Sequence, residues 1–484
     1  MPIFKSKLAF ITLTLLALAG CAAPQPEVSE QFQNDWEFKT VKGKVALVES
    51  APEAIARRIE LVRNAESSID IEYFSWNKDT TGLLFLNELV LAADRGVKVR
   101  IILDDLLVFN EKWLASAATH ENLDIQIFNP FNSRKAGWLT RAFDFQKHQK
   151  DLDHRLHEKY MNIDGETLVL GGRNIGDDYF SYKPKNNFFD LDILVQGEVT
   201  EDFERNFEEH WIAHYTSDIE FLIEFKDKKP LQSFHRTFEK VTKSKQDALA
   251  DIESRVRGLQ EPNYIAAKLT PVFDSAEKLH DSMPYFRHRI EHFVYRYPSA
   301  KKELVISTPY MLPNEDGFKV VTDFANHGAD ITLVTNSMAS NDSGFVPAYY
   351  ENHRDELLDK GVSIYEYDTH AIHLKNVHTR KGHYHNKAFI LDGKLSYIGS
   401  SNFDPRSDFL NLEFGIMIES EEFAQRLQHY LLGDKSLYWN VERNEDGKLE
   451  WRRGNQLKNK DPNYGGASKV FDKLYRAINI ENEL

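Results

Sequence analysis

The feature that most constrains the fold is a spaced set of five residue types that occurs twice in the chain. In the first copy these residues are His157, Lys159, Asp164, Gly171 and Asn174. In the second copy, at the same spacing, they are His385, Lys387, Asp392, Gly399 and Asn402. Five fixed residue types at about 5% each match by chance in about one chain of this length in ten thousand. The chain is therefore predicted to contain two copies of one structural unit.

The segments around the two copies repeat as well. A strand pattern, a helix pattern and a buried strand pattern follow one another at 69–76, 83–93 and 97–104, and again at 304–310, 320–326 and 330–335. Strand, helix and strand in this order predict a parallel α/β arrangement. The predicted fold is α/β and two-lobed, with tandem pseudo-symmetric α/β/α-layered halves that share one active site.

The domain boundaries follow from this repeat. The first half is predicted at residues 45–216, and the second half, with a C-terminal extension, at residues 303–484. Residues 217–302 are charged and helical in pattern, so they are predicted to form a helical connector between the halves.

Each copy places its residues where they can act on a phosphate ester. Residues 159–163 and 387–391 have strand patterns, so a His and a Lys two positions apart point to the same side. Two lysines and two asparagines can hold the phosphate oxygens on which charge grows in the transition state. One imidazole can attack phosphorus and form a phosphohistidine, while the other protonates the departing alcohol and deprotonates the incoming one. This chemistry needs no metal and no cofactor, and none is predicted.

A nucleophilic histidine has to be neutral, with its ring held in one tautomer, and a carboxylate behind the ring achieves this. The Asp-Leu-Asp sequence at 190–192 aligns with Asn-Leu-Glu at 411–413. This alignment predicts Asp192 and Glu413 as the carboxylates that orient the two histidines. The alternative is that both carboxylates are charges at strand ends.

The paired motif resembles that of the phospholipase D superfamily, over about residues 50–440. Residues 171–180 and 402–407 further resemble the bacterial cardiolipin synthases, those of the C type above all. The resemblance implies metal-independent phosphatidyl transfer between phospholipids, with His157 and His385 as nucleophile and general acid/base in an order that it leaves open. It implies a catalytic set made of His157, Lys159, Asp164, His385, Lys387 and Asp392, in which the two aspartates support the site. Asn174 and Asn402 are expected to bind the phosphate.

Four functions are compatible with this scaffold. The first is cardiolipin synthesis from phosphatidylglycerol with phosphatidylglycerol or phosphatidylethanolamine. The second is a phospholipase D that hydrolyses phospholipid to phosphatidic acid, the third is a nuclease, and the fourth is an inactive scaffold. The formal net charge of −15 disfavours nucleic acid, because phosphate contacts usually require a basic surface. The two complete motifs argue against an inactive scaffold.

The N-terminal segment has the pattern of an export signal. Lys5 and Lys7 precede an apolar run from 8 to 18 that is too short to span a bilayer, and a small-residue site precedes Cys21. This pattern predicts a lipoprotein signal peptide at 1–20, lipidation of Cys21 and a tether at 21–44. Ala22 follows in place of an inner-membrane retention aspartate. The expected location is the envelope of a Gram-negative-type bacterium, lipid-anchored in the outer membrane and facing the periplasm.

Two further segments are less specific. Four histidines lie before the second motif, namely His370, His373, His378 and His383, and their spacing favours a solvated loop over a metal site. Residues 128–143 combine aromatic residues with Arg134, Lys135 and Arg141. This segment is either a membrane-interface loop or a buried loop that covers the core.

Overall fold

The computed structural model describes residues 26 and 28 and the ranges 37–108, 111–133, 138–224, 229–371 and 382–478. The predicted signal peptide at 1–20 and the predicted lipidation site Cys21 lie outside these residues. Within the described ranges, no helix has both the length and the apolar composition that crossing a membrane requires.

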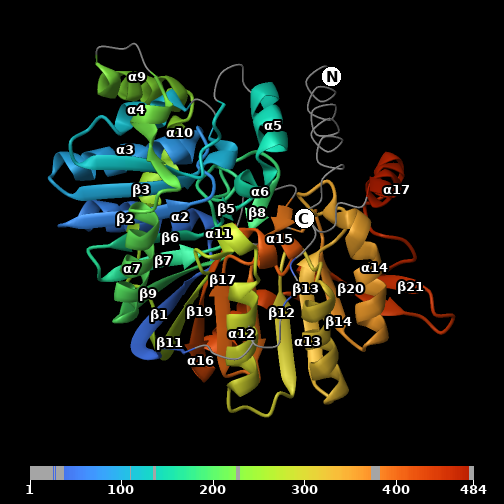
Figure 1. The fold of residues 1–484 in the computed structure, drawn as a ribbon. Helices are drawn as coiled ribbons and strands as arrows, with labels where there is room; N and C mark the ends of the chain where they lie inside the picture. Colours follow the sequence, from blue (N-terminus) through green and yellow to red (C-terminus); the bar gives the residue numbers. More distant parts are fainter. Residues whose placement is uncertain are drawn as a thin grey trace.

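One continuous order of paired strands runs through both halves of the molecule (Figure 1). The first half contributes β10 (Thr216–Asp218), β4 (Leu123–Phe128), β3 (Lys98–Asp104), β2 (Ser68–Tyr73), β6 (Lys159–Ile163), β7 (Thr167–Gly171), β9 (Asp192–Gly197) and β1 (Val41–Val48). The second half continues with β11 (Ile265–Phe273), β19 (Phe414–Glu419), β17 (Leu395–Gly399), β16 (Ala388–Leu391), β12 (Glu303–Ser307), β13 (Asp330–Asn336), β14 (Ser363–Tyr367) and β20 (Tyr438–Arg443). Each strand of one half thus has a counterpart in the other half at the same distance from the junction.

The junction between the halves is the antiparallel pair β1–β11. Val41 pairs with Leu269, Val45 with Ile265, and Gly43 lies opposite Ala267 at the centre. Gly43 is required there, because an added Cβ would lie 2.7 Å from the backbone oxygen of Gln196. The pseudo-twofold axis therefore passes beside Gly43, and the predicted α/β fold of tandem pseudo-symmetric halves is confirmed.

The observed repeat begins earlier in each half than the predicted boundaries. β1 starts at Val41, inside the predicted tether, and β11 lies inside the predicted helical connector of residues 217–302. The β11 sequence contains Pro271, which argues against a strand with neighbours on both sides, yet β11 pairs with both β1 and β19. The connector proper is therefore only residues 219–264, between β10 and β11.

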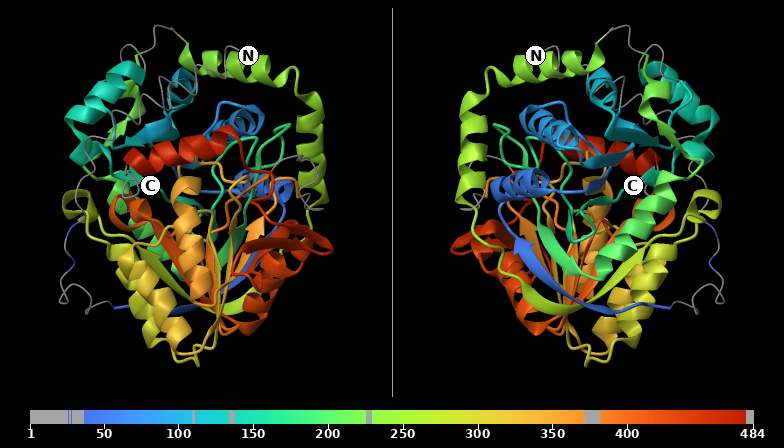
Figure 2. Two further views of the ribbon diagram at one scale, coloured as in Figure 1. Left: turned by 90° about the vertical axis from the view of Figure 1, so that its right-hand side faces the viewer. Right: turned by 90° about the vertical axis from the view of Figure 1, so that its left-hand side faces the viewer.

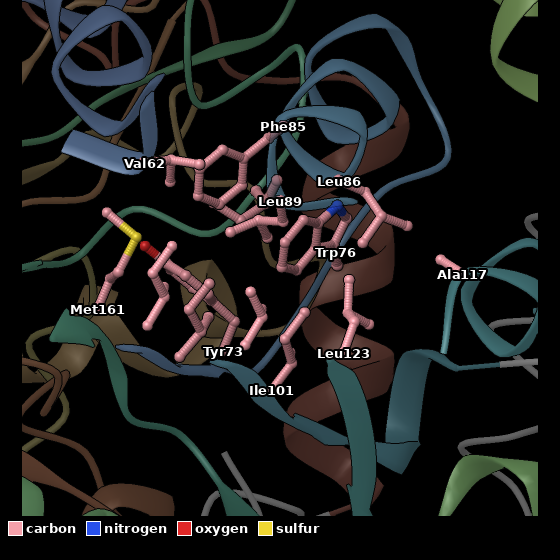
Figure 3. Close-up of a cluster of buried hydrophobic side chains, with 14 of the residues drawn as sticks. Val62, Tyr73, Trp76, Phe85, Leu86, Leu89, Ile101, Ala117, Leu123 and Met161 are labelled. Atoms are coloured by element: carbon pink, nitrogen blue, oxygen red, sulfur yellow. The ribbon is translucent and has the colours of Figure 1, made fainter. Parts of the chain in front are cut away.

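Helices cover both faces of the sheet. In the first half these are α2 (Ala51–Asn64), α3 (Thr80–Asp94), α4 (Lys112–Ala117) and α7 (Val199–Trp211). In the second half they are α12 (Tyr285–Arg296), α13 (Glu315–Asn326), α14 (Val346–Asp359) and α16 (Glu421–Leu432). Under α2 and α3 the core is tightly filled, with Trp76 stacked on Phe85 at 5.3 Å between ring centroids (Figure 3). A second cluster packs between the halves, where Phe203 of α7 lies 6.0 Å from Phe414 of β19.

The remaining elements lie on the periphery or near the site. The connector forms α8 (Ile219–Leu222), α9 (Pro230–Thr242) and α10 (Gln246–Gly258), and α9 and α10 arch over the first half outside α2 and α3 (Figure 2). Arg63 of α2 and Glu253 of α10 approach to 2.9 Å, which fixes this arch to the first half. The other helices are α5 (Trp138–Lys147), α6 (Gln149–Leu152), α11 (Lys278–Asp281), α15 (Pro405–Phe409) and α17 (Ala467–Ile478). The C-terminal extension adds the strands β21 (Leu449–Arg453) and β22 (Gln456–Lys458).

Candidate active site

Two short parallel strand pairs bring the halves together at the two histidines. β5 (Arg155–Leu156) of the first half pairs with β18 (Asn411–Leu412) of the second. β8 (Asn187–Phe189) of the first half pairs with β15 (Gly382–Tyr384) of the second. His157 directly follows β5 and His385 directly follows β15, while Glu413 and Asp190 follow the partner strands. Each histidine is thereby set beside a carboxylate from the other half.

The two histidine–carboxylate pairs cross between the halves. His157 Nδ1 lies 2.9 Å from Glu413 Oε1, and His385 Nδ1 lies 2.7 Å from Asp190 Oδ2. All four side chains are buried or nearly so. A carboxylate on Nδ1 fixes the tautomer with its proton there, so Nε2 of each ring keeps a lone pair for chemistry. Neither half contains a complete site by itself.

The carboxylate that holds His385 is Asp190, and the prediction of Asp192 was wrong. Gly171 of β7 pairs with Asp192 of β9, whereas Gly399 of β17 pairs with Gly415 of β19. Asp192 therefore corresponds to Gly415, and Asp190 corresponds to Glu413. The alignment of 190–192 with 411–413 was displaced by two residues.

Asp192 has a different task in the core. Its Oδ2 atom lies 2.8 Å from Arg58 NH1 and 3.2 Å from Arg173 Nε, and all three side chains are buried. Arg58 also donates to the Tyr73 hydroxyl at 3.0 Å. Asp192 thus neutralises two buried guanidinium groups and ties α2 to the loop after β7.

Glu413 lies against His157, and its surroundings differ from those of Asp190. Ser400 donates a hydrogen bond from its hydroxyl to Glu413 Oε2. At the corresponding position of the first half stands Gly172, where an added Cβ would collide with the carboxylate of Asp190. The two halves thus hold their carboxylates in different ways, and the site is only pseudo-symmetric.

The site keeps its histidines neutral. Burial lowers the pKa of His157 to about 4, the charges of Lys159 and Lys387 act in the same direction, and Glu413 opposes them. Burial and Lys387 also lower the pKa of His385. Burial raises the pKa of Glu413, but His157, Lys159 and Ser400 outweigh it and bring the value to about 2. Neutral imidazoles beside ionised carboxylates are the protonation states that a nucleophilic histidine requires.

The two lysines supply the positive charge of the site. Lys159 Nζ donates to the backbone oxygen of His157 at 2.6 Å, and Lys387 Nζ donates to that of His385 at 2.9 Å. Burial lowers the pKa of Lys159 to about 7 and that of Lys387 to about 8, against the attraction of Glu413 and Asp190. A bound phosphate anion would hold both protons in place, because an opposite charge favours the charged form.

The two asparagines are not equivalent. The Asn174 carboxamide accepts from the Ser75 backbone N–H at 3.1 Å and donates to the Tyr179 hydroxyl at 3.0 Å. Asn402 is held through its backbone, which donates to Ser407 Oγ at 3.0 Å, and its Oδ1 atom has no partner among the described residues. Asn402 therefore offers the freer carboxamide for a phosphate, and Asn174 also braces the loop between Ser75 and Tyr179.

Asp164 and Asp392 lie away from the chemistry, at the far ends of β6 and β16. Asp164 accepts from the backbone N–H groups of Glu66, Ser67 and Ser68 at 2.7–2.9 Å. Asp392 accepts from the backbone N–H groups of 301–303 at 2.6–2.9 Å. Each aspartate lies five positions after its lysine along an extended strand, which separates the two residues by about 17 Å. Their assignment to the catalytic set is corrected accordingly, because both aspartates anchor the turn after the strand to the start of β2 or β12.

We expect Asp164→Ala to destabilise the protein by about 2 kcal/mol, because it removes charge-assisted hydrogen bonds to three backbone donors. Partial burial raises the pKa of Asp164, but these donors outweigh it and lower the pKa below the usual 3.8. The stabilisation is therefore present above pH 3.8 and decreases as the pH falls below it. Denaturant unfolding at pH 7 and pH 3 measures both effects. A large loss of kcat in the folded variant would place Asp164 in the chemistry after all.

Aromatic rings wall the site on both sides. Phe74 packs edge-on against His157 at 5.3 Å between ring centroids. Phe188 and Tyr179 pack against His385 at 5.0 and 5.7 Å. These rings exclude water from the imidazoles, and they were missed in the sequence because aromatic residues occur throughout the chain.

One group of possible metal ligands occurs among the described residues. Ligand atoms of Glu72, Glu158 and His210 lie within 4.8 Å of one another, and all three side chains are buried. Glu158 stands between His157 and Lys159 and points to the opposite side of the strand. Glu158 accepts from Asn206 at 2.8 Å and His210 lies 3.2 Å from Glu72, so the group is satisfied as an ion-pair network on its own.

The less specific segments are only partly described. His373 and His378 lie outside the described residues, as do Arg134 and Lys135. His383 Nδ1 lies 2.7 Å from the backbone oxygen of Ser340. Arg141 is buried and lies 2.7 Å from Asp105, while Phe143 is 70% exposed. Of the two interpretations, the burial of Arg141 within α5 favours a segment that covers the core over one that enters the membrane interface.

Comparison with known proteins gives consistent matches. A family model described as "Cardiolipin synthase, PLD-like domain" matches residues 59–211 and 296–435. Cardiolipin synthase C of Escherichia coli K12 is 30% identical over 430 residues, covering 84% of this chain and 87% of that protein. Cardiolipin synthase 1 of Staphylococcus epidermidis RP62A is 26% identical and covers 81% of this chain and 67% of that protein. The crystal structure of phosphatidylserine synthase from Haemophilus influenzae superposes with a TM-score of 0.62 at 14% identity, covering 91% of this chain and 95% of that chain.

Proposed function

The chain belongs to the cardiolipin synthase family of the phospholipase D superfamily, and on this premise we propose that it makes cardiolipin by transferring a phosphatidyl group between two phospholipids. It is a phosphatidyltransferase of the phospholipase D type. The proposed donors are phosphatidylglycerol and phosphatidylethanolamine, and the proposed acceptor is phosphatidylglycerol. The observation that carries the proposal is the pair of buried histidines, each with a carboxylate from the other half on Nδ1.

The geometry supports a two-step transfer. Nε2 of one histidine, which is neutral, attacks phosphorus, and the bond from phosphorus to the headgroup oxygen breaks. The other histidine enters this step as its cation, because the bound phosphate anion favours a proton on its Nε2, and it donates that proton to the departing alcohol. That histidine then removes a proton from the hydroxyl of the acceptor. The acceptor oxygen attacks phosphorus, and the phosphorus–nitrogen bond breaks. Lys159, Lys387 and Asn402 hold the phosphate oxygens throughout, and Glu413 and Asp190 keep the rings oriented.

Product analysis tests this proposal. A chain that starts at residue 45 would lack the first half of β1, so we would use residues 38–484 with vesicles of phosphatidylglycerol and phosphatidylethanolamine in chelator. The proposal predicts cardiolipin, together with glycerol or ethanolamine according to the donor. Phosphatidic acid alone would mean that water is the acceptor and that the enzyme is a phospholipase D. If neither cardiolipin nor phosphatidic acid formed, the result would exclude action on these lipids.

The pH dependence of kcat/KM should reflect the pKa values of the histidine and lysine side chains in the free enzyme. We expect kcat/KM to rise with pH as the nucleophilic histidine loses its proton, at a pKa near 4 if that residue is His157, and to fall as Lys159 and Lys387 lose theirs near 7 and 8. The acid limb arises because a protonated imidazole cannot attack phosphorus. The alkaline limb arises because neutral lysines bind the phosphate less well. In kcat the alkaline limb should move to higher pH, since bound phosphate favours the charged lysines. An alkaline limb of kcat/KM near pH 10 would contradict the buried-lysine interpretation.

We also propose that Cys21 is lipidated and holds the enzyme on the outer membrane, facing the periplasm. The proposal is supported by the signal-like residues 1–20 and the small residues before Cys21. Growth with labelled palmitate should label the wild-type protein, and Cys21→Ser should remain unlabelled and leave the membrane fraction. Label on the Cys21→Ser variant would refute the assignment of this cysteine.

A further inference from the structure

An apolar cavity of about 120 Å³ lies in the second half, between α12 and α13 and above β12, β16 and β17. Its walls carry Phe286, Ile290 and Val294 on α12, and Val320, Val321 and Phe324 on α13. Most of the lining offers no hydrogen-bond partner to water, and apolar spaces of this size can accept apolar ligands.

The corresponding place in the first half is filled. The pairs Ile69–Ile163 and Leu304–Leu391 set β2 and β12 in the same register, so Trp76 corresponds to Met311 and Phe85 to Val320. The caps agree, because Asp79 accepts from Gly82 N–H at the start of α3 and Asn314 accepts from Gly317 N–H at the start of α13. Smaller side chains thus leave open in the second half a space that two stacked rings occupy in the first.

One end of the cavity lies against the loop that carries Asn402. Ser401 and Phe403 both line it, and they flank Asn402 on the same loop. Thr308, directly after β12, donates from its hydroxyl to the backbone oxygen of Asn402. At this end Arg287 lies 3.1 Å from Asp408, and both residues line the cavity. The apolar space therefore lies next to the loop whose Asn402 would hold the phosphate.

We propose that this cavity binds part of one acyl chain of the phospholipid whose phosphate lies at Asn402. The inference rests on the proposed function and names the lipid tail, in addition to the headgroup, as a determinant of substrate selection. An apolar cavity of about 150 Å³ holds a benzene molecule, so this smaller space takes a chain segment of about five carbons. Burial of each methylene is expected to raise kcat/KM about fourfold until the cavity is full.

The first test fills the cavity. Val321→Phe adds a ring at a buried lining position, and Lys319→Phe adds the same ring at an exposed neighbouring position. Phosphatidylglycerols with four to twelve carbons per chain would be compared at fixed mole fraction in mixed micelles. We expect wild type and Lys319→Phe to prefer longer chains. Val321→Phe should lose at least tenfold in kcat/KM on chains long enough to fill the cavity, and the loss should become smaller as the chain shortens to four carbons. Equal losses at every length would overturn the proposal.

The second test needs no turnover. A phosphatidylglycerol with a diazirine near the middle of one chain would be photolysed with His157→Ala, and labelled peptides would be mapped. The proposal predicts label on residues 285–326, suppressed in His157→Ala/Val321→Phe. Label on other residues would overturn the proposal that the cavity binds an acyl chain, even if the enzyme makes cardiolipin. Label on these helices without any cardiolipin synthesis in wild type would retain the lipid-tail site and reject the proposed transfer.

Discussion

Replacing either His157 or His385 by alanine is expected to lower kcat for phosphatidyl transfer by at least about 10⁴-fold. Each ring is one of two that must act in both steps, as nucleophile or as acid and base, and each is held by a carboxylate of the opposite half. Because the two rings act as a unit, the double variant should lose little more than either single variant. Cardiolipin formation under saturating lipid, with thermal unfolding as a fold check, measures this.

His383 provides a matched control for the two catalytic histidines. His383 lies two residues before His385, packs 5.6 Å from Phe188, and has its Nδ1 at 2.7 Å from the backbone oxygen of Ser340. We expect His383→Ala to keep kcat within about threefold, because its ring has no carboxylate from the other half behind it. Residual activity above about 1% in His385→Ala would contradict the two-histidine mechanism.

The second large effect separates two neighbouring aspartates. Asp190→Asn should lower kcat by about 10³- to 10⁴-fold with little loss of stability, because an amide can favour the wrong tautomer of His385 and cannot stabilise its cation. Asp192→Asn should instead destabilise the fold by about 3–5 kcal/mol, since it leaves Arg58 and Arg173 with a neutral partner in the core. Steady-state kinetics and denaturant unfolding of the two variants measure the contrast.

Glu413→Gln is the symmetric counterpart and should behave like Asp190→Asn, because Glu413 holds His157 as Asp190 holds His385. If Asp192→Asn instead lost its activity without a change in the free energy of unfolding, the prediction of Asp192 as the orienting carboxylate would be restored. That result would refute the strand register described above.

The sequence identified the repeated unit and Glu413 because both depend on fixed spacing within one half. It missed Asp190 because the equivalence of Asp190 and Glu413 depends on which residues pair across β7–β9 and β17–β19. A comparison of short sequence segments does not reveal that strand register. It also could not show that each carboxylate holds the histidine of the other half, since these contacts join residues 195 and 256 positions apart.

Other features were hidden for similar physical reasons. The strand β11 was missed because Pro271 lies inside it and charged helices precede it. Asp164 and Asp392 share the spacing of the catalytic residues, but a strand carries them to the opposite end of the fold. The cavity under α12 and α13 depends on how Met311 and Val320 fill space compared with Trp76 and Phe85, and this is decided by packing in three dimensions.

The central claim is that phosphorus becomes bonded to one of two histidines in a site shared by the halves. The most direct measurement uses a phosphatidyl p-nitrophenol donor, whose leaving group departs without a general acid, with His157→Ala and His385→Ala in parallel. After rapid quenching at neutral pH, intact mass and peptide mapping would locate any phosphatidyl group. The account predicts a stable adduct on the remaining histidine in one of the two variants and none in the other, which also identifies the nucleophile. No adduct in either variant, or an adduct on another residue, would contradict the account.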